Sequence, residues 1–349
     1  MSDAFATILG QPQVRDFLRS TVKSDHLTHA YLFVGPAGSN KTQAAHAFAQ
    51  AIVCPKGASG PRGGACGDCD NCSRVRKKTH PDVHYCEPEG VGGYLVEQVR
   101  EIMADVSLSP IQASRKVYII DRADLLNRSA ANAFLKTLEE PPEDVVLILL
   151  GRTRDSVLST IASRCQVVPF RHIPPTEAAG IVSQNTGASI EQSRMAMEAT
   201  SGSISNAIAF LNARGNERMF FRGELLSMLS RIDSMSDWQV LIEARGIIEK
   251  SKAPLDSLRA QQEEELARNQ DFLAKSAIRK IEERNKRRLT AETSACLKQA
   301  LSIVSSWLRD IAMLRAGTPE LVINGDALAS MQALAPYADI VRISAALRQ

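Results

Sequence analysis

A glycine-rich segment followed by lysine and threonine is the first chemical signal in this sequence. Residues 35–42 read GPAGSNKT and match G-x-x-x-x-G-K-T at every fixed position except 40, where asparagine replaces glycine. In such loops backbone N–H groups and a helix N-terminus converge on phosphate, the lysine adds positive charge, and the threonine hydroxyl binds Mg²⁺. Asparagine tolerates a left-handed backbone better than most residues, so we expect nucleotide binding to survive in a weakened form.

The second signal is an apolar run at 117–120 that ends in Asp121, a position from which a carboxylate can hold Mg²⁺. The next residue is Arg122, whereas an ATPase of this type needs a glutamate there to polarise the attacking water. Asp124 is shorter and starts from a different point of the turn, so we do not expect it to replace that base. The chain's own ATPase activity is therefore predicted to be weak or absent. The candidate residues for ATP or ADP with Mg²⁺ are Gly35, Gly38, Asn40, Lys41, Thr42 and Asp121.

Four of the seven cysteines lie within nineteen residues: Cys54, Cys66, Cys69 and Cys72. In a large chain without secretory features, two successive C-x2-C steps favour a tetrahedral zinc site over disulfides. With four protein ligands there is no open position for water, so the metal is expected to be structural. The other three cysteines are interpreted as buried thiols.

Arg164 lies in the tripeptide Ser163-Arg164-Cys165, between a helix-like stretch at 155–162 and an apolar segment at 166–168. By itself the tripeptide fits a surface arginine beside a buried cysteine. In ring-shaped ATPases, however, an arginine at the rim of one subunit reaches the γ-phosphate held by its neighbour. Arg164 is therefore a candidate catalytic residue acting in trans.

The elements that must position these residues alternate between short apolar strands and helices. Strands are predicted at 30–34, 83–86, 116–120, 145–150 and 166–169, and the spacing of apolar residues predicts an amphipathic helix over 96–106. This alternation is typical of an α/β fold with a parallel sheet covered on both faces. Beyond Pro174 only helical patterns follow. The predicted divisions are a nucleotide-binding module at 1–173 with the cysteine insert at about 54–72, a small helical unit at 174–220, and an all-α unit at 221–349 with a charged helical segment at about 255–290.

Composition limits the class of protein. Apolar residues make up 44% of the 349 residues and charged residues 23%, which excludes a disordered or collagen-like chain. The apolar runs are much shorter than the roughly 20 residues of a membrane span, so we expect a cytoplasmic protein with no membrane partner. A net charge of +3 is too small to predict nucleic-acid binding from bulk electrostatics.

Taken together, these motifs resemble the subunits of bacterial clamp loaders over residues 8 to about 170. Trp307-Leu308-Arg309-Asp310 is also similar to the C-terminal collar of that family. The segments that carry the resemblance are Gly10-Gln11, residues 29–33, the loop 35–42, the four cysteines, His80-Pro81-Asp82, residues 117–121, residues 131–142 and Ser163-Arg164-Cys165.

The resemblance implies an AAA+ module with a zinc knuckle, a helical lid and a helical collar, assembled with other subunits into a five-membered ring. The implied partners are the gamma/tau motor and delta subunits, the sliding clamp that the ring loads, and primer-template DNA. It also implies that Arg164 completes the ATP site of an adjacent motor subunit.

Departures from the family pattern distinguish between two subunit types. A gamma/tau motor would keep glycine at 40, glutamate at 122, and a lid arginine where this chain has Ile204-Ser205-Asn206. These three losses favour a delta-prime type, with a DNA polymerase III accessory role and a weak or absent ATPase activity of its own. The alternatives are a gamma/tau-type motor and a zinc-stabilised DNA-binding scaffold.

Two further expectations come from the resemblance. In related loaders, helix N-termini and polar residues line the ring and contact DNA phosphates, and Arg100, Ser129 and Lys136 occupy similar stretches here. An ordinary helix-surface role fits these three residues equally well. The gap between Cys54 and Cys66 is longer than the family's usual gap because of extra residues near 57–64, so Cys54 is the ligand that the resemblance supports least.

Overall fold

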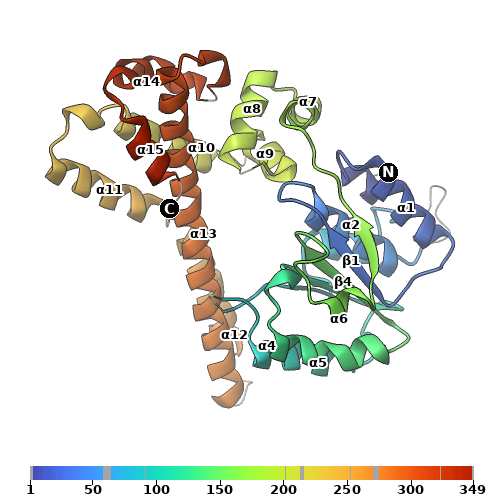
Figure 1. Ribbon diagram of the computed structural model, residues 1–349. Coiled ribbons are helices and arrows are strands. Elements are labelled where there is room, and N and C mark those ends of the chain that lie inside the picture. The colour runs from blue at the N-terminus through green and yellow to red at the C-terminus, as the bar shows by residue number, and fades with distance from the viewer. Residues whose placement is uncertain are drawn as a thin grey trace. The chain divides into compact units, whose positions relative to one another are not determined.

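The computed structural model describes residues 3–57, 64–90, 92–200, 202–212, 216–251, 253–269, 275–322 and 324–347 (Figure 1). The chain divides into two compact units. Unit 1 comprises Met1–Ile181 with Ser203–Ser205, and unit 2 comprises Val182–Gly202 with Asn206–Gln349. The finer division into a lid at 174–220 and a collar from 221 stays a prediction.

Unit 1 is built on a five-stranded parallel sheet in the order β2-β3-β4-β1-β5. All five predicted strands are confirmed, and β4 is one residue longer than predicted. The place of β1 between β4 and β5 brings segments far apart in the sequence into register, with Tyr31 beside Ile148 on one side and Gln166 on the other. The strands are β1 Ala30–Val34, β2 Val83–Cys86, β3 Lys116–Ile120, β4 Val145–Gly151 and β5 Gln166–Pro169.

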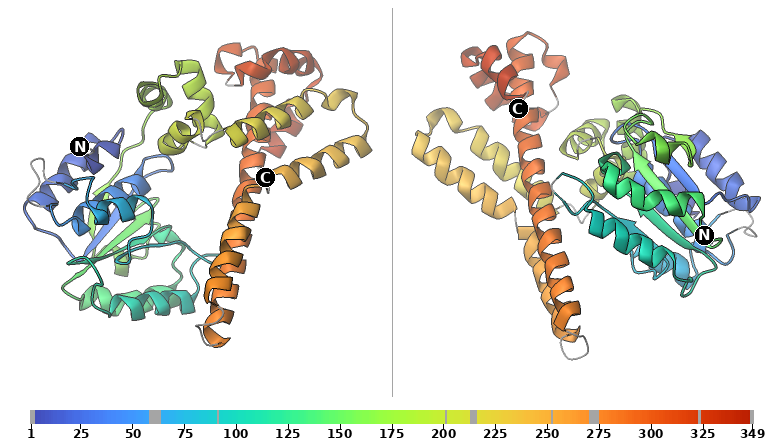
Figure 2. Two further views of the ribbon diagram at one scale, coloured as in Figure 1. Left: turned by 180° about the vertical axis from the view of Figure 1, so that it is seen from behind. Right: turned by 60° about the horizontal axis from the view of Figure 1, so that its bottom comes forward.

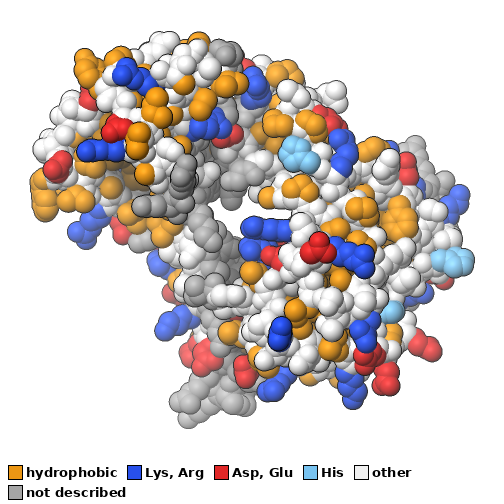
Figure 3. Space-filling model, in the orientation of Figure 1, with side chains coloured by type: hydrophobic (Ala, Val, Ile, Leu, Met, Phe, Trp, Pro, Cys, Tyr) orange, Lys and Arg blue, Asp and Glu red, His pale blue; other side chains and the backbone are white. Residues whose placement is uncertain are grey.

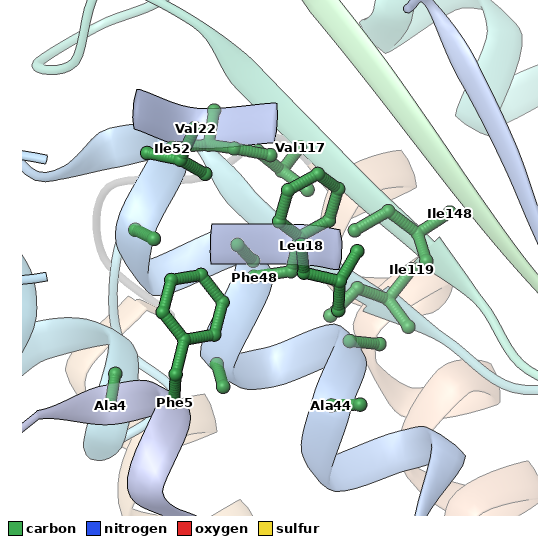
Figure 4. Close-up of a cluster of buried hydrophobic side chains, with 14 of the residues drawn as sticks. Ala4, Phe5, Leu18, Val22, Ala44, Phe48, Ile52, Val117, Ile119 and Ile148 are labelled. Atoms are coloured by element: carbon green, nitrogen blue, oxygen red, sulfur yellow. The ribbon is translucent and has the colours of Figure 1, made fainter. Parts of the chain in front are cut away.

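Helices cover both faces of this sheet, as predicted for parallel strands. Side chains alternate along a strand, so Tyr31 and Phe33 of β1 pack into one core while Leu32 packs into the other. Figure 4 shows the first core, where Leu18 and Phe48 lie beside strand residues. This core is covered by η1 Ala4–Thr7, α1 Pro12–Lys23, α2 Lys41–Val53 and α3 Asp70–Arg76; the opposite core by α4 Val96–Val106, η2 Ala123–Leu125, α5 Arg128–Glu139 and α6 Ser159–Ala162.

Unit 2 is helical throughout the part that the structure describes. The longest helix, α13, packs Ile303, Trp307 and Ile311 against Leu225 of α10 and Met331 of α14. The described residues of the charge-rich segment 255–290 fall on α12 and the first part of α13, which run side by side (Figure 2), and residues 270–274 lie outside the described part of the chain. After α7 Pro175–Thr186, which crosses the boundary, the elements are α8 Ile190–Ala199, α9 Ile204–Leu211, α10 Asn216–Leu229, η4 Ile232–Ser234, α11 Asp237–Ser251, α12 Ala253–Asn269, α13 Lys275–Arg315, η5 Pro319–Leu321, η6 Gly325–Ala327, α14 Leu328–Leu334, η7 Ala335–Tyr337 and α15 Ile340–Ala346.

A buried polar network centred on Asp310 joins the elements of unit 2. Asp310 is fully buried and accepts hydrogen bonds from Asn324 N at 2.7 Å and Arg309 Nη2 at 2.9 Å. Asn324 Oδ1 accepts from Arg222 Nη2 at 2.7 Å, and Arg309 Nη1 reaches Glu198 of α8 at 3.2 Å. Because each buried charge has a partner, this network fixes how α8, α10 and α13 pack together.

The charge distribution on the surface and the apolar character of the helices bear on two of the expectations from the sequence. On the face shown in Figure 3, acidic and basic side chains are interspersed, in keeping with the small net charge. None of the described helices has the length and apolar character needed to cross a membrane.

Candidate nucleotide and metal sites

The glycine-rich loop connects β1 to α2 and requires unusual backbone at two positions. Gly38 has φ 76°, and Asn40, the residue before α2, has φ 67° and ψ 22°. Asparagine therefore adopts the left-handed conformation that glycine would take in the motif. Gly35 is needed for a different reason, because a Cβ there would lie 2.6 Å from the carbonyl oxygen of Phe170. The loop thus has the backbone form of a phosphate-binding turn.

Lys41 turns back onto this loop. Its Nζ donates to the carbonyl oxygens of Gly35 at 2.6 Å and Pro36 at 2.8 Å, and to Ser39 Oγ at 3.2 Å. Burial lowers the pKa of Lys41, against the opposing effect of the nearby Asp121 carboxylate. The ammonium that would contact phosphate is therefore satisfied by the chain's own oxygens.

The Asn40 side chain ties the loop to two other segments. Its Nδ2 donates to the carbonyl oxygens of Thr7 and Leu9, both at 3.3 Å, and its Oδ1 accepts from Ser205 Oγ at 3.1 Å. Buried Gln11 adds a link, since its Nε2 donates to Ser39 O at 3.1 Å. The sequence predicted that asparagine would be tolerated here and did not predict this bridging role, because the partners are 33 and 165 positions away.

Asp121 follows β3 as predicted, and both of its carboxylate oxygens accept hydrogen bonds from the chain. Tyr85 OH donates to Oδ2 at 2.9 Å, and the backbone N–H of Arg122 donates to Oδ1 at 2.9 Å. Burial raises the pKa of Tyr85, so this phenol remains a protonated donor at neutral pH. Arg122 has φ 52°, and its Nε lies 3.7 Å from Asp124 Oδ2. The position of the missing base thus carries a cation that faces Asp124.

Arg164 lies between α6 and β5, which is an edge strand of the sheet. Its Nη2 donates to Glu139 Oε1 at 2.6 Å, and its Nη1 donates to Thr160 O at 2.9 Å. Its side chain is 36% exposed. Among the described residues, no hydrogen bond joins Arg164 to the loop 35–42 of the same chain.

The four cysteines converge at the other end of α2. Their sulfur atoms all lie within 4.8 Å of one another, with Cys54 Sγ to Cys69 Sγ at 4.0 Å and Cys66 Sγ to Cys72 Sγ at 3.9 Å. A tetrahedral zinc site with Zn–S bonds of about 2.3 Å has sulfur atoms about 3.8 Å apart. All four thiols, Cys54 included, therefore fit a zinc ion. Of the residues between Cys54 and Cys66, 58–63 lie outside the described part of the chain.

Backbone N–H groups in the turn favour the thiolate form of these ligands. Cys66 N donates to Cys54 Sγ, Cys69 N to Cys66 Sγ and Cys72 N to Cys69 Sγ, each at 3.4 Å. Burial raises the pKa of the Cys66 thiol, but hydrogen bonds from the backbone of Asp68 and Cys69 outweigh it and lower the pKa to about 6. Burial raises the pKa of Cys54, whose deprotonation would therefore benefit from a bound cation.

A second layer of residues supports this cluster. Asn71 Nδ2 caps the end of α2 by donating to Val53 O at 2.8 Å, and Gln112 Nε2 donates to Asn71 Oδ1 at 2.8 Å. Asp82, fully buried, holds the loop that contains Gln112 by accepting from three successive backbone N–H groups at 2.6–2.7 Å. Asp82 belongs to the His80-Pro81-Asp82 segment that carries part of the family resemblance, and the sequence indicates its supporting role only by an aspartate directly before a predicted strand.

The three candidate DNA contacts are exposed residues of neighbouring helices. Arg100 lies on α4, and Ser129 and Lys136 lie on α5; the two helices pack together on one face of the sheet. This placement makes the three side chains accessible, and their role stays a prediction.

The region that carries these sites is similar in sequence to known proteins. Residues 10–174 match the family described as "DNA polymerase III, delta subunit". The chain is 36% identical over 165 residues to subunit delta' of Bacillus subtilis, covering 47% of this chain and 49% of that protein. It is 31% identical over 229 residues to subunit tau of the same organism, covering 64% of this chain and 39% of that protein. The chain thus spans half or less of the length of these relatives.

One solved structure also aligns with this chain. The crystal structure of a DNA polymerase III gamma-subunit-related protein from Thermotoga maritima aligns with 92% of this chain and 98% of that chain, at a TM-score of 0.44 and 16% identity. Residues 10–174 are thus similar to DNA polymerase III subunits of the delta' and tau types.

Proposed function

We propose that this protein is a delta-prime-type subunit of a clamp loader, with a weak or silent nucleotide site and an arginine that serves a neighbouring motor subunit. The observation that carries this proposal is that Asp121 is hydrogen-bonded within the chain and that the next residue is Arg122. Both Asp121 oxygens accept hydrogen bonds from the chain, and the position of the catalytic glutamate is an arginine that faces Asp124. A site in this condition lacks a group to activate water.

The glycine-rich loop supports the same conclusion. The Lys41 ammonium and the Asn40 amide already have oxygen partners within the chain, and a nucleotide must compete with them. The loop keeps its left-handed turns and Thr42, so ATP or ADP with Mg²⁺ can still bind, with lower affinity than in a loop whose lysine is free.

Arg164 has the placement expected of an arginine that acts in trans. It precedes an edge strand, and its side chain is one-third exposed. Three hydrogen bonds occupy it, to Glu139, Thr160 and Ser163, whereas a guanidinium has five N–H donors. The remaining donors suit the γ-phosphate of a neighbouring subunit, where an arginine offsets charge in the transition state.

The remaining parts of the proposal follow from the family. Unit 1 acts as the AAA+ module, residues 174–220 as its lid and residues 221–349 as the collar of a five-subunit ring in the cytoplasm. The ring contains gamma/tau and delta subunits and loads the sliding clamp onto primer-template DNA, with Arg100, Ser129 and Lys136 near the phosphates.

Zinc has a structural role in this proposal. Cys54, Cys66, Cys69 and Cys72 would hold it, and the ion would supply a crosslink between the end of α2 and the start of α3. These thiols fill all four positions of a tetrahedral site, so the chain offers no place for a zinc-bound water.

Reconstitution with purified gamma/tau and delta subunits tests the proposal. Arg164→Ala should lower the ATPase rate stimulated by clamp and primed DNA, because arginine fingers contribute about 10³–10⁵ in kcat at the site they serve. Arg154→Ala, an exposed arginine on the loop after β4, is the matched control and should leave the rate unchanged. An unchanged rate with Arg164→Ala would remove the trans role.

The second candidate, a gamma/tau-type motor, is favoured by the retained Lys41, Thr42 and Asp121 and by the longer match to tau. It predicts steady ATP turnover by the isolated chain that Lys41→Ala abolishes. Measurement of phosphate release by the chain alone separates the two candidates, because a delta-prime type should show no turnover above background.

A further inference from the structure

An ion pair at the end of α5 engages Arg164. Glu139 is the last residue of α5, and its Oε1 accepts from Arg164 Nη2 at 2.6 Å. Thr160 O binds the other terminal nitrogen, so the guanidinium is held from two sides. The pair crosses from α5 to the turn after α6, two elements that pack together.

Glu139 lies where a carboxylate does little for its own helix. The C-terminal end of a helix carries partial negative charge, so glutamate is disfavoured there. Glu140 follows directly and its backbone N–H completes the helix by donating to Lys136 O. Arg164 is the cation that pairs with Glu139 at this helix end.

The pair is also weak enough to exchange. The two side chains are 52% and 36% exposed, and ion pairs between exposed groups contribute about 0–1 kcal/mol. A γ-phosphate carries more negative charge than a single carboxylate and accepts bidentate hydrogen bonds from arginine. A phosphate on a neighbouring subunit can therefore take the guanidinium from Glu139.

We propose that Glu139 is a positioning residue that holds Arg164 against Thr160 in the free chain and releases it when a neighbouring subunit presents a triphosphate. This inference rests on the proposed trans role of Arg164. Before the ring is fully assembled on clamp and DNA, the Glu139 pair withholds the arginine, so idle ATP hydrolysis by the neighbour is suppressed.

The first test concerns the pair itself and uses the isolated full-length chain. Phenylglyoxal modifies accessible arginines, and mass spectrometry gives the rate at Arg164. Glu139→Gln should raise that rate about two- to fivefold, the change that up to about 1 kcal/mol of pairing allows. Glu140→Gln is the matched control and should match the parent. Equal rates in all three proteins would overturn the proposal.

The second test concerns the consequence in the reconstituted loader. Glu139→Gln should raise the ATPase rate measured without clamp and DNA, Glu140→Gln should not, and the double variant Glu139→Gln/Arg164→Ala should be as slow as Arg164→Ala alone. A rate equal to or below the parent with Glu139→Gln would overturn the positioning role while Arg164→Ala still lowers activity. If Arg164→Ala itself has no effect, the trans function and this inference both fail. Melting temperatures of all variants exclude misfolding as the cause.

Discussion

The two ends of α2 hold the two candidate sites. The two sites differ in whether their polar groups already have hydrogen-bond partners within the chain. At the N-terminal end, Lys41 and Asn40 find oxygen partners within the chain. At the C-terminal end, the Cys54 sulfur meets three other sulfurs and accepts a hydrogen bond from the backbone N–H of Cys66. A loop satisfied internally keeps its shape without a ligand, whereas four converging thiols gain most of their stabilisation from a cation.

This difference indicates how one helix can serve two purposes. The loop end has the backbone form of a phosphate-binding turn, and its side chains crosslink neighbouring segments. The cysteine end has the donor set of a structural metal, with Asn71 capping the helix next to it. Loss of the bound partner should therefore be costly at the cysteine end and mild at the loop end.

The largest expected effect is at the cysteine end. Cys69→Ser should reduce zinc from about one equivalent per chain and lower the melting temperature strongly, because structural zinc contributes about 10–16 kcal/mol in small domains. Elemental analysis and differential scanning calorimetry measure the two quantities. Cys296→Ser, at a cysteine outside the cluster, is the control and should retain the metal. Freshly purified parent protein without zinc would contradict the assignment of this end of α2.

The next largest effect is expected at Asp82, which supports the cysteine cluster and is not one of its four candidate ligands. Asp82→Asn should cost about 3 kcal/mol, because a buried carboxylate loses charge-assisted bonds from the backbone of 111–113. Urea unfolding with zinc present measures it, with the exposed Asp155→Asn as control. A loss as small as the control's would mean that the metal alone fixes this end.

The same carboxylate gives a pH dependence. Despite burial, the three backbone N–H donors lower the pKa of Asp82 below its ordinary value. Since the unfolded value is about 3.9, its contribution is fully present above that pH and is lost as the pH falls through the folded pKa. Asp82→Asn should therefore flatten the loss of stability that sets in as the pH falls below about 4, and an unchanged acid limb would argue against this role.

A smaller effect is expected at the loop end. Asn40→Gly restores the glycine of the motif and removes the bonds to Thr7, Leu9 and Ser205. We expect tighter binding of a fluorescent ADP analogue with Mg²⁺. We also expect a loss of stability of about 1 kcal/mol, because the three hydrogen bonds are lost while glycine relieves the strain of the left-handed backbone and so offsets part of that loss. Affinity that falls or stays constant would show that Asn40 does not restrain the loop.

The smallest effect concerns Asp121. Tyr85→Phe removes the phenol bond to Oδ2 and should cost about 1 kcal/mol of stability. The same change frees one carboxylate oxygen for Mg²⁺. Thermal melts with and without Mg-ADP measure both, and the expected result is a lower melting temperature without ligand and a larger shift on its addition. A melting-temperature shift equal to the parent's would mean that the Tyr85 hydrogen bond does not weaken Mg²⁺ binding at Asp121.

Much of unit 1 was predictable because its signals are local. Each of the five strands is an uninterrupted apolar run, the pattern of strands buried on both faces, and the structure confirms all of them. The cysteine cluster was predicted from spacing alone, and the geometry brings in Cys54 despite its long gap to Cys66. The left-handed turn at Asn40 was inferred from which residues tolerate that conformation.

Contacts between distant segments could not be predicted in the same way. Nothing near Arg164 in the sequence indicates Glu139, which lies 25 positions earlier at the end of another helix. The phenol that occupies Asp121 comes from the neighbouring strand β2, 36 positions away. Pairing of this kind depends on strand order and helix packing, which residue spacing does not encode.

Sequence by itself determined which chemistry is present: a phosphate-type loop, an aspartate followed by an arginine, four thiols at metal spacing, and an arginine in a Ser-Arg-Cys tripeptide. Only the tertiary structure decided which of these groups are already engaged. The parallel sheet brings Tyr85 to Asp121, the loop turn brings Lys41 onto its own carbonyl oxygens, and α5 brings Glu139 to Arg164. The physical reason is that residue type fixes what a side chain can bind, whereas its partner is set by which backbone segments pack within hydrogen-bonding distance.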